Sequence, residues 1–172
     1  SNTIYIWATS LDIELRGTHD WIRNVLTHEL THIITLNKAR HNWPFQFALI
    51  QVSRFDANPD ISFAFPLYHM SAPRGWAEGI AQYGARKFGY DTWDSHRDML
   101  LRMAVLEDDL LDYTEMSVFT SRHGFYPEMT YNQGFSLVNY IDSVYGADAV
   151  HVSARTKSFF HFNRSLRKAT GR

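Results

Sequence analysis

The sequence predicts an α+β fold that is mostly helical, with a small β element at its N-terminus. Three observations lead to this class. Apolar residues recur at helical spacing in several long segments, one short N-terminal segment alternates as strands do, and glycine or proline marks several segment ends. A length of 172 residues with 45% hydrophobic residues suits one domain with a full core. We therefore expect residues 1–172 to form a single domain.

The composition excludes several kinds of partner and site. A formal net charge of −1 gives no reason to expect a nucleic-acid partner. The chain has no cysteine, so disulfides and thiolate metal sites are excluded and any metal must be bound by His, Asp or Glu. No apolar run in the sequence is long enough to span a bilayer, and no signal peptide is visible at its start.

A strand and a long helix are predicted first. Thr3 to Ala8 alternates β-branched and aromatic residues, a pattern typical of a strand. Thr18 is a suitable N-cap for a helix from about His19 to Asn37. Apolar residues cover most faces of this helix, so we expect it to be central and largely buried.

The middle of the chain predicts three further helices and one extended stretch. Pro44 and Pro73 fit helix starts, and Gly89 fits a helix end. Thr92 or Asp94 is placed to cap the last of the three helices. In chain order the predicted elements are a helix over residues 44–55, an extended stretch over 61–70, and helices over 74–88 and 93–108.

The C-terminal part predicts an irregular stretch followed by three helices. Residues 110–129 show no clear periodicity. Apolar residues repeat at helical spacing over 131–145, and Gly146 ends that helix. Shorter helices are predicted over 147–156 and 161–170. The chain ends directly after the last helix, so we expect it to be a fragment of a longer protein.

One short motif carries most of the functional information. Residues 28–32 read His-Glu-Leu-Thr-His, which is the pattern H-E-x-x-H. On a helix, residues four apart project from one face, so the imidazoles of His28 and His32 can reach one metal ion, usually zinc. Glu29 is offset by about 100° and can take a proton from a metal-activated water. The alternative is a pair of hydrogen-bonded core histidines with a surface glutamate.

A zinc hydrolase normally uses three protein ligands, so a third ligand is needed. The position six residues after His32, which is a histidine in metzincins, is Lys38 here, and that arrangement is excluded. Glu78 is the best-placed third ligand because it lies early on a predicted helix among small and aromatic residues, where a charge needs a partner. His41, His69 and several aspartates remain alternatives.

Three segments in order resemble the gluzincin metallopeptidases of the MA clan. They are HELTH from His28, WAEGIAQY from Trp76 and YNQGFSL from Tyr131. The closest resemblance is to the aminopeptidase-N-like branch and its bacterial peptidase MA-like relatives. It implies a zincin-like domain in which the helix that carries the first segment is the active-site helix.

The resemblance also implies the residues of the site and their roles. His28, His32 and Glu78 would bind zinc, and Glu29 would be the general base. Tyr131 would donate a hydrogen bond to the oxyanion of the tetrahedral intermediate; the alternative is a tyrosine that only packs. The implied activity is zinc-dependent hydrolysis of peptide bonds in a peptide or protein substrate.

Two further residues are candidates for supporting roles. Gln82 lies one turn after Glu78 and could accept a hydrogen bond from a zinc-binding histidine, unless it is an exposed amide. His123 precedes the tyrosine segment and could assist at the oxyanion, unless it is exposed. The resemblance also implies a periplasmic or secreted location and a β-propeller after this domain in the full-length chain.

The chain departs from the family in ways that keep other functions open. It lacks the segment that binds a free amino terminus in aminopeptidases, so aminopeptidase activity is not implied. Only one strand is predicted before the active-site helix, where gluzincins have a sheet. This favours a first rival, a catalytically inactive zincin-like binding or structural domain of a larger exported protein. A second rival is a metal-independent helical interaction domain.

Overall fold

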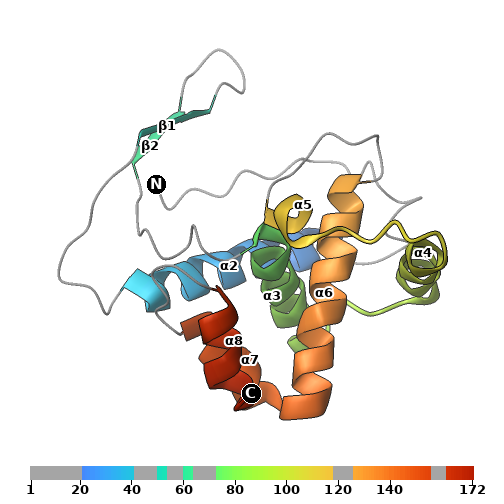
Figure 1. Cartoon of the computed structure of the whole chain (residues 1–172). Helices are drawn as coiled ribbons and strands as arrows, with labels where there is room; N and C mark the ends of the chain where they lie inside the picture. Colours follow the sequence, from blue (N-terminus) through green and yellow to red (C-terminus); the bar gives the residue numbers. More distant parts are fainter. Residues whose placement is uncertain (1–20, 41–49, 54–59, 64–72, 118–125, 156–161) are drawn as a thin grey trace.

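Helices make up most of the chain that the structure describes. The computed structural model describes residues 21–40, 50–53, 60–63, 73–117, 126–155 and 162–172. Its elements (Figure 1) are α2 (Trp21–Arg40), β1 (Ile50–Ser53), β2 (Asp60–Phe63), α3 (Arg74–Lys87), α4 (Ser95–Leu106), α5 (Tyr113–Ser117), α6 (Tyr126–Tyr145), α7 (Ala147–Arg155) and α8 (Phe162–Thr170).

Helix α3 lies at the centre, between α2 and α6. Gly79 of α3 faces Gly134 of α6, and a Cβ atom at Gly134 would overlap the backbone carbonyl of Gly75. Only glycine lets two helix backbones approach so closely. On the side of α3 that faces α2, Thr31 occupies the space where a side chain at Gly84 would lie. These contacts fix the position of α3 relative to both neighbours.

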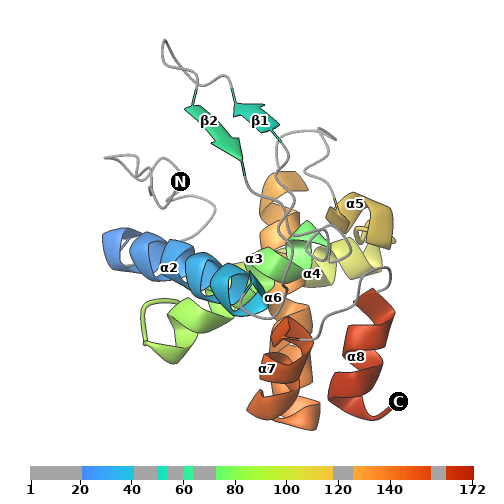
Figure 2. The ribbon, with the colours of Figure 1, turned by 90° about the vertical axis from the view of Figure 1, so that its left-hand side faces the viewer.

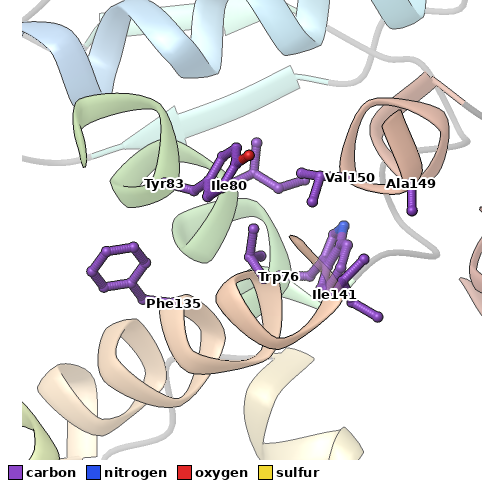
Figure 3. Packing of buried hydrophobic residues seen from close by; sticks show 8 residues of the cluster. Trp76, Ile80, Tyr83, Phe135, Ile141, Ala149 and Val150 are labelled. Carbon is purple, nitrogen blue, oxygen red and sulfur yellow. The ribbon is translucent and has the colours of Figure 1, made fainter. Parts of the chain in front are cut away.

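The hydrophobic core lies where α3, α6 and α7 meet (Figure 3). Its buried members come from these three helices: Trp76, Ile80, Tyr83, Phe135, Val138, Ile141, Ala149 and Val150. Ring contacts attach the flanking segments to it. Phe162 of α8 packs edge-on against Trp76, with ring centroids 5.1 Å apart, and Trp93 does the same against Phe135 at 5.7 Å. Each buried aromatic side chain contributes roughly 1.5–3 kcal/mol to folding.

The predicted α+β fold class is wrong. The only strands in the described ranges are β1 and β2, an antiparallel pair in which Ile50 pairs with Phe63. Figures 1 and 2 show this hairpin extending away from the helices, so it takes no part in the core. The described fold is all-α because α3 buries its faces against other helices and leaves no apolar layer for a sheet. The predicted N-terminal strand, residues 3–8, lies outside the described residues.

Two predictions for α2 and its surroundings are also wrong. The helix is not largely buried, because one apolar stripe of it is exposed, made up of Ile22, Leu26, Leu30 and Ile34. The helix predicted over residues 44–55 is a strand at Ile50–Ser53, and its other residues lie outside the described ranges. Val52 and Ile50 are β-branched, which favours the extended conformation.

The structure confirms one predicted helix cap and corrects two other predictions. Asp94 is confirmed as the N-cap of α4, since its Oδ1 accepts a hydrogen bond of 2.9 Å from the backbone N–H of Arg97. Helix α6 begins at Tyr126, five residues earlier than predicted. Pro127 explains the difference, because proline is well tolerated in a first turn. The short helix α5 interrupts the stretch that was predicted to be irregular.

Among the described helices, none combines the length and the apolar character that crossing a membrane requires.

The contact between α3 and α6 predicts a large effect of one methyl group. Gly134→Ala would gain about 1 kcal/mol of helix propensity. We expect the steric conflict with the Gly75 carbonyl to outweigh this gain and to lower the free energy of unfolding by about 2 kcal/mol net, since a backbone atom cannot rotate away. Urea denaturation measures the effect.

Ser143→Ala is the matched control, because Ser143 is exposed on the same helix. It should change the free energy of unfolding by less than about 0.5 kcal/mol. A Gly134→Ala protein as stable as the wild type would contradict the close packing of α3 on α6.

Candidate metal centre

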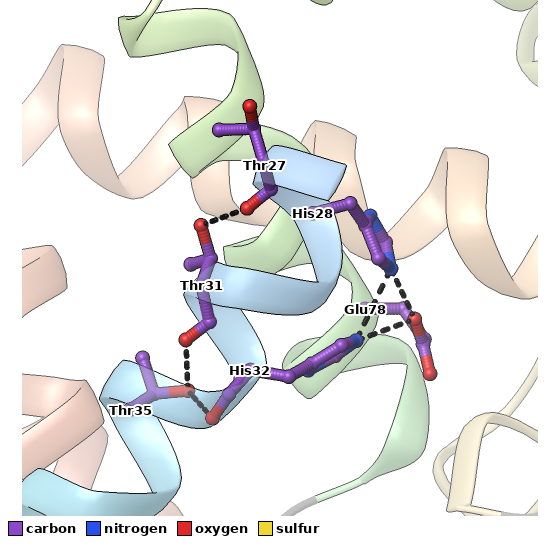
Figure 4. A network of polar contacts seen from close by, with 6 residues as sticks. All are labelled: Thr27, His28, Thr31, His32, Thr35 and Glu78. Atoms are coloured by element: carbon purple, nitrogen blue, oxygen red, sulfur yellow. Dashed lines mark hydrogen bonds and ion pairs between the residues drawn. The ribbon is translucent and has the colours of Figure 1, made fainter. Parts of the chain in front are cut away.

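Three side chains from α2 and α3 converge on one point (Figure 4). The Nε2 atom of His28 lies 3.0 Å from Oε2 of Glu78, and Nε2 of His32 lies 3.1 Å from the same oxygen. The two Nε2 atoms are 3.1 Å apart. Three potential ligand atoms therefore form a nearly equilateral triangle, although Glu78 follows His32 by 46 positions.

The helix geometry explains why these side chains meet. His28 and His32 are four residues apart on α2, so both project from the face that α3 covers. A ladder of threonines runs along the same helix: Thr31 donates to the backbone carbonyl of Thr27 at 2.8 Å, and Thr35 donates to that of Thr31 at 2.8 Å. The central threonine of this ladder packs on α3, which sets the rotation of α2.

The donor set fits a zinc ion. With ligand bonds of about 2.0 Å in a tetrahedron, zinc ligand atoms lie ~3.3 Å apart, close to the observed edges of 3.0 to 3.1 Å. Two imidazoles and one carboxylate suit zinc or a neighbouring transition metal better than calcium or magnesium, which prefer oxygen ligands. The side chains are mostly buried, with exposed fractions of 12% for His28, 20% for His32 and 15% for Glu78.

Charge pairing shifts two pKa values in this cluster. Burial by itself raises the pKa of Glu78 above its ordinary 4.5, but the hydrogen bonds from His28 and His32 lower it to about 2. Burial by itself lowers the pKa of His32, but the hydrogen bond to Glu78 and the charges of Glu78 and Glu29 raise it above 6.5. Without a metal ion, His32 thus acts as a positive partner of the kind that the buried carboxylate needs.

Glu29 and Tyr131 lie beside this cluster. Both line a small polar cavity together with His28. The Tyr131 ring lies with its centroid 6.0 Å from that of the His28 ring, tilted by 48°. Glu29 and Tyr131 are each partly exposed, so both side chains have access to the cavity and to solvent. The structure brings these two residues to the same side of His28, although α2 and α6 are far apart in sequence.

The remaining predicted site residues have different outcomes. Gln82 is buried, with 2% exposed, so the alternative of an exposed amide is wrong. Its Oε1 atom has no hydrogen-bond partner among the described residues, so it accepts no bond from either histidine. His123, His41 and His69 lie outside the described residues.

The cavity contains three polar residues that the sequence did not single out. Asn24, Asp91 and Arg97 line it and are almost completely buried. Asn24 carried a usable signal, because it lies one turn before His28 on the same face of α2. Asp91 and Arg97 carried none, since a charge in a turn or on a short helix is usually solvated.

The pKa shifts predict how the stability of the metal-free protein depends on pH. Glu78 has a lowered pKa in the folded state, so its contribution is present above 4.5 and is lost as the pH falls toward 2. His32 has a raised pKa, so its contribution is present below 6.5 and is lost as the pH rises through the folded value. The cluster should therefore stabilise the fold most between pH 4.5 and pH 6.5.

Urea denaturation with a chelator present measures this effect as the difference between the wild type and Glu78→Gln. The difference should be largest in that window and should shrink on both sides of it. A difference that does not vary with pH would show that the histidines and Glu78 are not paired in solution.

Comparison of the chain with models of protein families, with curated proteins and with solved structures finds no match. We therefore infer the function from the chemistry of the cluster and of its surroundings.

Proposed function

We propose that this chain is a zinc metallopeptidase domain of the gluzincin type, which hydrolyses peptide bonds. The convergence of His28, His32 and Glu78 on one point carries the proposal. Two nitrogen donors and one oxygen donor leave a fourth tetrahedral position for water or substrate, which is the usual composition of a catalytic zinc site. The resemblance of the three sequence segments extends the proposal to a periplasmic or secreted protein with a β-propeller after this domain.

The residues around the cluster have complementary roles in this proposal. A bound zinc ion would supply a Lewis acid that polarises the scissile carbonyl and makes water more acidic. Glu29 takes the proton of the attacking water and delivers it to the leaving amine. Tyr131 donates a hydrogen bond to the oxygen on which negative charge develops. His28, His32 and Glu78 would hold the ion, and the packing of α2 on α3 keeps them in place.

A second candidate is a domain that binds the metal ion but does not catalyse hydrolysis. One observation favours it: within the described ranges, no strand lies against the cluster to pair with the backbone of an extended peptide. Extended peptides are commonly bound by adding them as a strand to an exposed sheet edge. Both candidate functions include binding of the metal ion, but only the first includes hydrolysis of peptides.

Glu29→Gln is the variant that tests the proposed chemistry. The amide keeps the size of the side chain but cannot accept the water proton, so hydrolysis should fall by at least about 10²-fold. The variant should keep one zinc ion per chain, because Glu29 is not one of the three converging residues. Zinc content is measured by atomic emission, and hydrolysis is measured by mass spectrometry of a degenerate peptide library.

Glu107→Gln is the matched control, because Glu107 is an exposed glutamate at the end of α4. It should hydrolyse the library like the wild type. Undiminished hydrolysis by Glu29→Gln would exclude the mechanism. A wild-type protein that holds zinc but cleaves no peptide would establish the second candidate.

Tyr131→Phe tests the oxyanion role separately. Loss of one oxyanion donor typically lowers kcat by about 10²- to 10³-fold, and we expect this range with KM little changed. Tyr140→Phe, at an exposed position of the same helix, should leave kcat unchanged. Equal kcat values for Tyr131→Phe and the wild type would assign Tyr131 to packing alone.

A further inference from the structure

The polar cavity beside the cluster has features that holding a metal ion does not require. Its volume is about 80 Å³. That is roughly the space of two to three water molecules in the liquid, so it can hold a group of a few heavy atoms. The partly exposed residues His28, Glu29 and Tyr131 line it together with the buried residues Asn24 and Arg97. The cavity thus extends from the proposed reacting groups into the protein.

Its most buried lining residues form a polar wall without net charge. Arg97 and Asp91 are exposed by only 2% and 7%, and they form an ion pair of 2.8 Å between Nη1 and Oδ1. The same Nη1 donates to the backbone carbonyl of Thr92, and the guanidinium lies over the Phe135 ring at 5.3 Å. The charge of Arg97 is therefore compensated within the wall, and an anionic ligand group would find no free counter-charge there.

The same wall offers hydrogen-bonding groups of both kinds. Gln82 lines the cavity with a buried amide, which can donate and accept. Its Oε1 atom, Oδ2 of Asp91 and Nε of Arg97 have no hydrogen-bond partner within the described part of the chain, but they have almost no accessible surface and lie behind the atoms that a ligand would touch. Asn24 adds a buried amide, which can both donate and accept.

We propose that this cavity is a substrate subsite that binds a carboxamide side chain, asparagine above all, next to the scissile peptide bond. The inference rests on the proposed peptidase function. A carboxamide is neutral, has three heavy atoms, and donates and accepts at once, so it matches the size, charge and bonding capacity of the wall. An aliphatic side chain of similar size would offer no hydrogen bond to the amides of Asn24 and Gln82, which a hydrogen-bonding site rejects strongly.

The test measures specificity in the zinc-loaded protein. Cleavage of the degenerate peptide library should be enriched for asparagine at one position flanking the scissile bond. For a matched pair of peptides with asparagine or leucine at that position, kcat/KM should favour asparagine by at least about 10-fold. Asn24→Leu removes one amide of the wall and should lower kcat/KM for the asparagine peptide by about 10-fold, with a much smaller effect on the leucine peptide.

Two controls separate a subsite from a general loss of structure. Asn163→Leu makes the same change at an exposed position of α8 and should keep the wild-type preference. Asn24→Asp keeps the shape of the side chain but, when ionised, cannot donate, so it should also reduce the preference even if Asn24→Leu folds poorly. Thermal unfolding monitored by circular dichroism verifies the folding of each variant.

The outcomes distinguish the subsite from the peptidase function. Hydrolysis without a carboxamide preference, or with a preference that neither Asn24 variant reduces, would overturn the subsite and leave the peptidase function standing. If no peptide is cleaved, the peptidase function fails. The subsite is then tested by itself, by fluorescence anisotropy of the labelled asparagine and leucine peptides with the chelator-treated wild type. Tighter binding of the asparagine peptide, reduced in Asn24→Leu, would support the subsite, and equal binding would overturn it.

Discussion

The fit of α3 between α2 and α6 is the constraint on which the rest of the described structure depends. Gly134 of α6 leaves no room for a side chain against the backbone of α3, and Thr31 of α2 fills the space above Gly84. On α3, Glu78 lies between Gly75, whose backbone meets Gly134, and Gly84, which meets Thr31. A shift of α3 along or away from either neighbour would move the carboxylate out of reach of the two histidines. The glycine contacts therefore set the geometry of the candidate metal centre as well as the packing of the core.

Burial makes the polar groups near α3 depend on one another. Glu78 lies mostly out of water and stays ionised because two imidazoles share one of its oxygens. Arg97 and Asp91 lie deeper and compensate each other. Buried pairs of this kind contribute little net stability, since desolvation offsets their attraction, but removing one partner leaves a costly isolated charge. The buried polar groups around this small cavity are therefore not explained by stability alone.

The sequence predicted the site better than it predicted the fold. Helical spacing places His28 and His32 on one face whatever the surroundings are, and an early helical position with small neighbours singled out Glu78. These local rules need no knowledge of tertiary structure. That the three side chains bind zinc and act in hydrolysis remains a prediction.

The fold class and part of the cavity needed information that local patterns do not contain. The apolar residues of α2 suggested a buried helix, yet its stripe from Ile22 to Ile34 is exposed. The prediction failed because a single sequence does not show which apolar face of a helix packs against a partner. The strand at Ile50–Ser53 lies where Pro44 suggested the start of a helix. Arg97 and Asp91 could not be singled out, since only the crossing of α4 with α6 reveals that their charges are buried.

A diffraction map collected at the zinc absorption edge tests the central claim most directly. It locates the metal ion without reference to activity, substrate or stability. The metal centre described above predicts one anomalous peak, about 2.0–2.2 Å from Nε2 of His28, Nε2 of His32 and a carboxylate oxygen of Glu78. No peak at these atoms in zinc-loaded crystals, or a peak whose third protein ligand is another residue such as His41 or His69, would contradict it.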